Sequence, residues 1–279
     1  EEVRVVEIKD LLRECGFRFE KKFGQNFLTD GNLLSAIVSD AGVTAEDTVV
    51  EIGAGAGTLT AKLAGAAGRV IAFEIDENLR KPLAAVLGRF GNVETVFGDV
   101  MDFSMEEIEN MAGGPYKVVA NLPYYITTPV IMKFIEQSRR MTSMTVMVQK
   151  EVAERLAAKP ATKEYGRITV AADFFGGAVY KRTVPRSMFY PAPNVDSAVV
   201  RIDRNKRFDA DGELFRKVVK SAFAMRRKIL STCLASGLGI GKEKAAALIE
   251  MSGHSPSVRG ETLSAEDFAV LTNVIKNNM

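Results

Sequence analysis

The sequence has little of the two residue types that build most zinc and disulfide sites. Its 279 residues include two cysteines, Cys15 and Cys233, and a single histidine, His254. The cysteines lie far apart and form no CxxC pair, which excludes a disulfide framework and a His/Cys zinc site. We therefore expect a protein that holds no metal ion and works in a reducing compartment, the cytoplasm.

Long apolar runs are also missing. No stretch reaches the roughly 18 consecutive apolar residues that a membrane span needs, and residues 1–10 lack the basic-then-apolar order of a signal peptide. Apolar residues make up 47% of the chain and charged residues 26%, which is typical of a folded globular protein. We expect no membrane partner, and a monomer because no unpaired apolar stripe is evident.

The net charge of the whole chain is only +2, but the charges are segregated. Residues 1–203 hold 24 basic and 27 acidic side chains, whereas residues 204–279 hold 13 basic and 8 acidic ones. Residues 216–228 of the second part contain no acidic side chain and six basic ones. We call these six the basic block: Arg216, Lys217, Lys220, Arg226, Arg227 and Lys228. The basic block indicates either a contact with a polyanion or a solvated helix face.

Short apolar runs alternate with helical patterns from residue 48 to about residue 203. The runs predict strands at Thr48–Ile52, Arg69–Phe73, Val93–Phe97, Lys117–Ala120, Met144–Val148, Gly177–Tyr180 and Ser197–Ile202. Helical spacing between and before them predicts helices at Ile8–Cys15, Asn32–Ser39, Leu59–Ala66, Asn78–Phe90, Pro129–Gln137 and Glu151–Ala158. Strands that alternate with helices favour a mostly parallel, doubly wound sheet.

The pattern becomes purely helical after residue 204. Helices are predicted at Glu213–Phe223, Arg227–Ala235, Lys242–Glu250 and Ala265–Lys276, with glycines as stops between them. The polar stretch Asp203–Asp211 is the best candidate for a linker. We therefore predict two domains, an α/β domain over residues 1–203 and a smaller all-helical domain over residues 204–279.

A glycine-rich turn follows the first predicted strand of the sheet. Glu51 and Ile52 end the strand, and Gly53, Gly55 and Gly57 lead directly into a helix. Glycines at this point let the backbone turn tightly and approach a ligand without a Cβ in the way. The spacing is GxGxG rather than the GxGxxG of dinucleotide sites, so a nucleoside without a pyrophosphate is the better fit.

Acidic residues stand at the ends of the next two strands. Glu74 follows Gly53 by 21 residues, at the distance where a carboxylate accepts the hydroxyls of a ribose. Asp99 follows Gly98 at the end of the third strand, where it can accept an amino group of adenine. Each acid alone is more often a loop residue or a helix cap, but together with the glycine turn they outline an adenosine pocket.

The fourth strand ends in Asn121-Leu122-Pro123-Tyr124. The amide oxygen of Asn121 and the backbone carbonyl of Leu122 can converge on one amino group, because Pro123 restricts Leu122 to an extended conformation and has no N–H to compete. Tyr124 offers a face to a planar base. These are the needs of an enzyme that acts on an exocyclic amine conjugated to a ring, although a simple proline turn has the same sequence.

Seven motifs occur in one order along the chain: residues 23–28 (FGQNFL), 51–57 (EIGAGAG), 73–76 (FEID), 98–99 (GD), 121–125 (NLPYY), 189–197 (FYPAPNVDS) and 223–230 (FAMRRKIL). Together they resemble the ribosomal RNA adenine N6,N6-dimethyltransferases, and within that family the bacterial enzymes that modify 16S rRNA. The resemblance implies a Rossmann-like, S-adenosylmethionine-dependent methyltransferase domain with a helical C-terminal domain. The ordered set carries this resemblance, since each motif also occurs alone elsewhere.

The resemblance also implies roles for particular residues. S-adenosylmethionine, the expected cofactor, would contact Asn26, Leu28, Gly53, Gly55, Glu74, Asp99 and Asn121. The target adenine would be held at Asn121 and Leu122 and would stack on Tyr124 and Phe189, although Tyr190 is adjacent to Phe189. Phe27 is open to two interpretations, a lid over the site or an anchor of its loop in the core.

The implied reaction is methyl transfer to N6 of two adjacent adenosines near the 3′ end of 16S rRNA, in the 30S ribosomal subunit or its precursor. Alignment of the methyl group with N6 matters more than a nucleophile of the protein, so no general base is required. The target adenine must leave its stack to reach a deep pocket. Phosphates around it would be held by Lys181, Arg182, Arg186 and the basic block. If the basic block is only a solvated helix face, Lys21 and Lys22 would contact the RNA in its place.

Three alternatives stay open from the sequence. One is a 23S rRNA adenine N6-methyltransferase of the macrolide-resistance type, which Thr127-Thr128-Pro129 and the helical tail disfavour. Another is a methyltransferase for DNA adenine or protein glutamine, which Leu122 disfavours, because those enzymes carry a second proline there. The last is an RNA-binding ribosome assembly factor without catalysis, which the presence of Glu74, Asp99 and Asn121 makes unconvincing as a sole role.

Overall fold

A computed structural model describes residues 5–18, 25–205, 208–225 and 227–279. The chain divides into two compact units, one built from the chain up to Ala153 together with Val179–Ile202, the other from Glu154–Ala178 and Asp203–Met279. This division differs from the predicted domains, 1–203 and 204–279, in one segment. Residues 154–178 group with the helical unit because the Phe174 ring stacks on that of Phe215, with centroids 3.8 Å apart.

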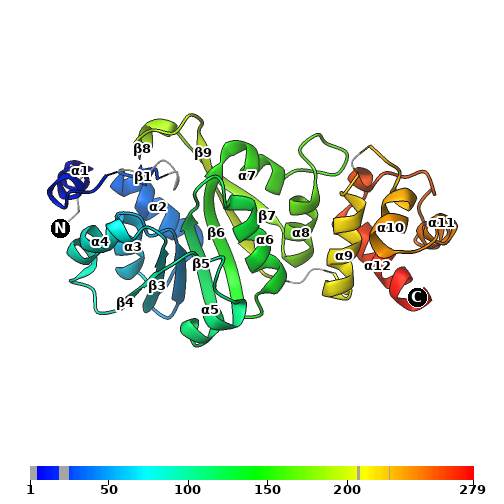
Figure 1. Ribbon diagram of the computed structural model, residues 1–279, viewed down its shortest axis with the longest axis horizontal. Helices are drawn as coiled ribbons and strands as arrows, with labels where there is room; N and C mark the ends of the chain where they lie inside the picture. Colours follow the sequence, from blue (N-terminus) through cyan, green and yellow to red (C-terminus); the bar gives the residue numbers. More distant parts are fainter. Residues whose placement is uncertain (1–4, 19–24, 206–207, 226) are drawn as a thin grey trace. The chain divides into compact units, whose positions relative to one another are not determined.

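The first unit is built around a seven-stranded sheet (Figure 1), whose strand order is β4-β3-β2-β5-β6-β9-β7. The strands are β2 (Thr48–Ile52), β3 (Arg69–Glu74), β4 (Val93–Phe97), β5 (Tyr116–Asn121), β6 (Met141–Gln149), β7 (Ala178–Val184) and β9 (Ser197–Asp203). The pairs β2–β3, β2–β5, β3–β4 and β5–β6 are parallel. The predicted sheet is therefore confirmed, with strands extended by up to four residues at their ends.

Helices of this unit are α1 (Val5–Glu14), α2 (Gly31–Ala41), α3 (Thr58–Ala64), α4 (Arg80–Leu87), α5 (Met105–Ala112), α6 (Thr127–Gln137) and α7 (Lys150–Leu156), which ends in the second unit, with a short 3₁₀ helix η2 (Glu77–Leu79). Val49 and Val119 point into a core shared with α2, α3 and α4, whereas their neighbours Val50 and Val118 point to the other face. All four side chains are fully buried, so helices cover both faces of the sheet.

The sheet reverses its winding direction between β2 and β5. The chain leaves β2 for β3 and β4 on one side, then returns to β5 and β6 on the other. In open α/β sheets such a switch point opens a crevice at the carboxyl ends of the strands. Gly53, Glu74, Gly98 and Asn121 stand at or directly after the ends of β2, β3, β4 and β5, which are neighbours in the sheet, so the topology brings the predicted site residues to one edge.

A separate two-stranded sheet contributes residues to this edge. Its strands are too short to be predicted from a sequence pattern. β1 (Phe27–Leu28) pairs antiparallel with β8 (Phe189–Tyr190), which places Leu28 opposite Phe189. A 3₁₀ turn, η3 (Arg186–Met188), leads into β8. The pairing joins the N-terminal motif to the motif at residues 189–197 across more than 160 residues of chain.

The second unit holds α8 (Arg167–Phe175), α9 (Gly212–Ala222), α10 (Leu230–Leu238), α11 (Lys242–Met251), η4 (Gly260–Thr262) and α12 (Ala265–Asn278). Asp211 caps α9 by accepting hydrogen bonds from the amides of Glu213 and Leu214. Phe215 and Phe268 are buried in its core. The predicted helical tail is confirmed, and none of the described helices is long and apolar enough to cross a membrane.

Candidate active site

One pocket opens at the carboxyl ends of β2, β3, β4 and β5, with an empty volume of about 940 Å³ that includes its open mouth. All ten residues predicted for the site line this pocket: Asn26, Leu28, Gly53, Gly55, Glu74, Asp99, Asn121, Leu122, Tyr124 and Phe189. They come from six separate segments of the chain. A concave site with a few polar groups that converge from separate segments is typical of a small-ligand site.

The glycine turn after β2 forms the floor beside β3. The amides of Gly53 and Ala54 both donate to the Phe73 carbonyl, at 2.9 and 3.0 Å. Gly53 and Gly55 have φ of +79° and +59°, a left-handed conformation that other residues rarely adopt. A Cβ at Gly55 would lie 3.0 Å from the Phe27 ring, so a side chain there would displace the loop that covers it.

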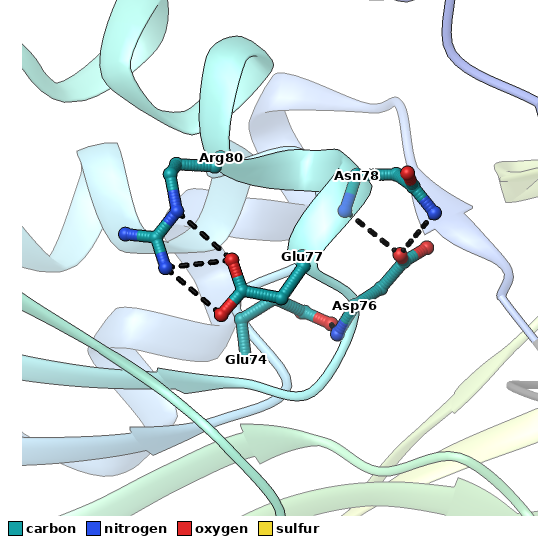
Figure 2. Close-up of polar contacts among 5 residues, drawn as sticks. All are labelled: Glu74, Asp76, Glu77, Asn78 and Arg80. Atoms are coloured by element: carbon teal, nitrogen blue, oxygen red, sulfur yellow. Dashed lines mark hydrogen bonds and ion pairs between the residues drawn. The ribbon is translucent and has the colours of Figure 1, made fainter.

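Glu74 ends β3 with its carboxylate already fixed by two backbone amides. One oxygen accepts from Gly55 N–H at 2.7 Å, and the other accepts from Asp76 N–H at 2.9 Å. Figure 2 shows the second contact, with Glu74 and Asp76 on one tight turn. Burial raises the pKa of Glu74, and the two amides offset part of that effect. Its lone pairs that remain can accept hydroxyl groups of a ligand.

Asp76 fixes this turn through hydrogen bonds, although the sequence analysis assigned it no role. Its side chain is almost fully buried and accepts hydrogen bonds from the amide and the side chain of Asn78, at 3.0 and 2.9 Å. It also accepts a 2.6 Å hydrogen bond from the side chain of Gln25, a lining residue of the pocket. Glu77 pairs instead with Arg80 at 2.6 Å (Figure 2). Asp76 thus ties the N-terminal segment to the Glu74 turn.

Asp99 follows Gly98 at the end of β4, next to Glu74. The amide of Gly98 donates to the Glu74 backbone carbonyl at 2.8 Å, which fixes the spacing of the two strand ends. One carboxylate oxygen of Asp99 accepts from the amide of Met101 at 2.8 Å. The two acids therefore line the same side of the pocket, as the sequence predicts for an adenosine site.

The Asn121 turn, after β5, lines the pocket next to the glycine turn. The side-chain amide of Asn121 donates to the Asn26 carbonyl at 3.1 Å, so its NH₂ group faces the N-terminal segment. Leu122 is buried, and its amide donates to Met147 of β6 at 3.1 Å. A Cβ at Gly53 would lie 3.5 Å from the Asn121 carbonyl oxygen. The glycine turn and the Asn121 turn therefore approach each other closely.

Two aromatic residues line the pocket beyond this turn. Tyr124 is half-buried, and its hydroxyl lies 3.0 Å from the hydroxyl of Ser197 at the start of β9. Burial raises the pKa of Tyr124, so the phenol stays neutral. Phe189 lines the pocket from β8, whereas its neighbour Tyr190 is 38% exposed and does not. Between the two adjacent aromatics, the structure therefore places Phe189 at the site.

The N-terminal segment covers one end of the pocket through Asn26, Phe27 and Leu28. Phe27 is only 6% exposed, and its ring centroid lies 6.0 Å from that of Phe17. This burial favours the interpretation of Phe27 as an anchor over that of a lid. Phe23 and Gly24 of the same motif, and Lys21 and Lys22, lie outside the described residues.

The basic side chains predicted to meet RNA divide into two groups. Arg182 forms two hydrogen bonds to the Asp40 carboxylate, at 2.6 and 2.9 Å, so it is engaged within the fold. Arg186 and Lys181 are exposed. In the basic block Lys217, Lys220, Arg227 and Lys228 are exposed, Lys217 with an ion pair to Glu213, while Arg226 lies outside the described residues.

Sequence reasoning missed several lining residues, among them Thr58 and Tyr125. Tyr125 is 53% exposed, and its position as a second tyrosine after the Asn121 turn was the signal that could have identified it. No group of three or more His, Cys, Asp or Glu side chains is placed to hold a metal ion within the described part of the chain.

The sheet order, the glycine turn and the two strand-end acids together define a Rossmann-like, S-adenosylmethionine-dependent methyltransferase. The family model "Ribosomal RNA adenine dimethylase" matches residues 16–276. The chain therefore belongs to the ribosomal RNA adenine dimethylase family.

Named relatives of the chain agree with this family. The chain is 44% identical over 279 residues to Ribosomal RNA small subunit methyltransferase A of Enterococcus faecalis, covering 97% of this chain and 95% of that protein. It is 42% identical over 277 residues to the protein of the same name from Clostridioides difficile, covering 97% and 96%.

Two solved structures share the fold. A dimethyladenosine transferase from Plasmodium falciparum aligns with a TM-score of 0.76 at 24% identity, covering 90% of this chain and 98% of that one. The 23S rRNA methyltransferase ErmE aligns with a TM-score of 0.68 at 24% identity, covering 90% and 100%. At this identity the two structures support the architecture of the chain and no finer statement.

Proposed function

We propose that the protein transfers methyl groups from S-adenosylmethionine to N6 of two adjacent adenosines near the 3′ end of 16S rRNA, giving N6,N6-dimethyladenosine. One observation carries this proposal. The Asn121-Leu122-Pro123-Tyr124 turn lines the same pocket as the strand-end acids Glu74 and Asp99. A site for an exocyclic amine and a site for an adenosine-containing donor therefore meet in one cavity.

The residues present fit S-adenosylmethionine. Gly55 lets the glycine turn pass close to the Phe27 ring, where a Cβ would collide. Glu74 offers a fixed carboxylate for the ribose hydroxyls, and Asp99 offers one for the adenine amino group. Asn26, Leu28, Gly53 and Gly55 would hold the remainder of the molecule. When bound, this donor supplies an electrophilic methyl group on a sulfonium centre.

Asn121 and Leu122 would act on the target amine. The N6 lone pair is delocalised into the ring, so in the first transfer acceptors on both N–H bonds turn it toward the methyl group; in the second transfer one N–H remains for an acceptor. We assign these acceptors to the Asn121 amide oxygen and the Leu122 backbone carbonyl. The contact between the Asn121 NH₂ group and the Asn26 carbonyl supports this assignment, because it leaves the amide oxygen on the other side.

Tyr124 and Phe189 would hold the target base by stacking, which offsets part of the few kcal/mol needed to unstack it. N6 gains one methyl group and loses one proton in each transfer, and the proton leaves to solvent past Asn121. Neither step needs an ionised side chain, in keeping with the neutral phenol of Tyr124.

The RNA partner would be 16S rRNA within the 30S subunit or its precursor, which also places the protein in the cytoplasm. The 44% identity over nearly the full length to small subunit methyltransferase A supports this substrate. The exposed side chains of the basic block, together with Lys181 and Arg186, are available for phosphates.

The test is transfer of tritium from labelled S-adenosylmethionine to small subunits that lack the modification. We expect incorporation into 16S rRNA and none into large subunits or DNA. Asn121→Ala should lower single-turnover transfer at saturating donor by at least about 100-fold, because its contact with the target amine forms mainly in the transition state. Near-normal transfer by this variant, or labelling of 23S rRNA by the intact protein, would overturn the proposal.

A further inference from the structure

A lysine lies buried in the apolar face of α6. Its neighbours Val130, Ile131, Phe134 and Ile135 are fully buried, and Lys133 itself is only 7% exposed. Lysine is almost never buried unless its ammonium has partners, because removing the charge from water is costly. The position of Lys133 therefore requires an explanation that apolar packing does not supply.

The ammonium of Lys133 directs its hydrogen bonds to one turn. It donates to the backbone carbonyls of Val100 at 2.9 Å, of Met101 at 3.0 Å, and of Phe103. An ammonium has three N–H donors, so this single turn accounts for all of them. Burial lowers the pKa of Lys133, and the charges of Asp99, Asp102 and Glu107 offset part of that effect.

This turn is the one that carries Asp99. The Met101 amide donates to the Asp99 carboxylate at 2.8 Å, and the Asp102 amide donates to the Asp99 carbonyl at 2.9 Å. Val100 lines the pocket directly. The orientation of the Asp99 carboxylate thus depends on the conformation of residues 100–103, which is the conformation that Lys133 holds.

We propose that Lys133 is a positioning residue for the adenine end of the pocket, acting through the turn at residues 100–103 on Asp99. The proposal rests on the proposed function, since it takes Asp99 as the partner of the donor's adenine amino group. Lys133 also lies on α6, the helix that directly follows the Asn121 turn. It therefore connects the segment that holds adenine to the segment that performs methyl transfer.

Lys133→Met tests the proposal, because methionine has a similar length and apolar stem but no donors. Lys117→Met is the matched control. Lys117 also donates to a backbone carbonyl, that of Gly42, and pairs with Asp47 at 2.7 Å, but it stands at the opposite end of β5. Both variants lose a partly or fully buried lysine from the same unit, and only one of them contacts the Asp99 turn.

The readout is binding of S-adenosylhomocysteine by calorimetry, compared with its inosine analogue, in which an oxo group replaces the adenine amine. The intact protein should prefer the adenine compound. Lys133→Met should weaken its binding about tenfold or more, a change of about 1.4 kcal/mol, and should lose most of the preference. Lys117→Met should lower the melting temperature while its affinity stays within about twofold of the intact protein.

A double-mutant cycle with Asp99→Asn separates positioning from general destabilisation. We expect Asp99→Asn to cost much less affinity in the Lys133→Met background than in the intact protein. Additive losses, or unchanged affinity and preference in a folded Lys133→Met variant, would overturn the proposal. If Lys133→Met does not fold, Lys133→Gln, which keeps two donors, takes its place in the same cycle. Failure of the intact protein to bind S-adenosylhomocysteine would instead refute the proposed function.

Discussion

Glu51, at the end of β2, is a fully buried carboxyl group beside the glycine turn. Neither of its oxygens has a hydrogen bond of ordinary geometry among the described residues. Burial raises its pKa to about 8, the Thr60 hydroxyl offsets this only in part, and Glu74 adds a repulsive charge. Glu51 is therefore protonated in the folded protein at neutral pH, although it ionises near pH 4.5 in an unfolded chain.

The sign of the resulting pH dependence follows from this raised pKa. The contribution of protonated Glu51 to folding is fully present below about pH 4.5 and is lost as the pH rises toward about 8. We expect Glu51→Gln, which cannot ionise, to gain stability relative to the intact protein as the pH rises from 5 to 9. Urea unfolding at several pH values measures this difference, and a difference that does not change with pH would contradict the assignment.

Individual residues also show how far the sequence predicts the site. Glycine turns, strand-end acids and the Asn121 turn follow directly from the order of strands and motifs, so all ten predicted residues line one pocket. Lys133 and the pair Gln25–Asp76 were not predicted. Their roles depend on contacts between segments more than 30 residues apart, which no local pattern encodes.

At the scale of helices and strands, prediction worked where a short apolar run or a clear helical spacing marks the element. The seven strands and most helices were found within a few residues of their bounds. α8 was missed because Thr169–Ala172, Phe174 and Phe175 are all buried, so its apolar residues lack helical spacing. α5 was also missed, although the capping box of Ser104 and Glu107 is a signal for the start of a helix that the sequence contains.

α5 also contributes a carboxylate that joins two elements across the unit. One oxygen of Glu109 accepts from the Ser138 hydroxyl at 2.7 Å and from the amides of Arg139 and Arg140 at 2.7 and 2.9 Å, where α6 ends and β6 begins. These hydrogen bonds outweigh burial and lower the pKa of Glu109. The stabilisation is therefore present above the ordinary pKa of a glutamate and is lost as the pH falls through the lowered value.

We expect Glu109→Gln to reduce the unfolding free energy at pH 7 by about 1–3 kcal/mol, as for other hydrogen bonds to a charged group. The loss should shrink as the pH falls through the lowered pKa of Glu109, because the intact protein is then protonated as well. Glu106→Gln, an exposed neighbour on the same helix, should change stability by less than about 0.5 kcal/mol. Equal effects of the two variants in urea unfolding would show that the Glu109 contacts do not contribute.

At the scale of the whole molecule, the predicted methyl-transfer residues and the positive charge lie in different units. Every residue that lines the pocket belongs to the first unit, whereas the basic block belongs to the second. Catalysis in one unit and substrate recognition in the other would be consistent with this arrangement. Sequence alone could not show that residues 154–178 join the helical unit, because their grouping depends on side-chain packing on α9 and α12.

Replacement of Arg226, Arg227 and Lys228 together by alanine should weaken binding to 30S subunits and flatten its salt dependence. The slope should change by up to about one unit for each lost phosphate contact. Affinity for S-adenosylmethionine should not change. Lys242→Ala with Lys244→Ala removes exposed charge from α11 as a control. An unaltered salt slope in the triple variant would identify the basic block as a solvated surface.

The central claim is that this pocket dimethylates N6 of two adjacent adenosines. The most direct measurement is mass spectrometry of 16S rRNA from unmodified small subunits after incubation with the protein and S-adenosylmethionine. We predict N6,N6-dimethyladenosine at two adjacent positions near the 3′ end, which requires Tyr124 and Phe189 to admit an adenine that already carries one methyl group. Monomethylated adenosine alone, or methylation elsewhere, would contradict the account.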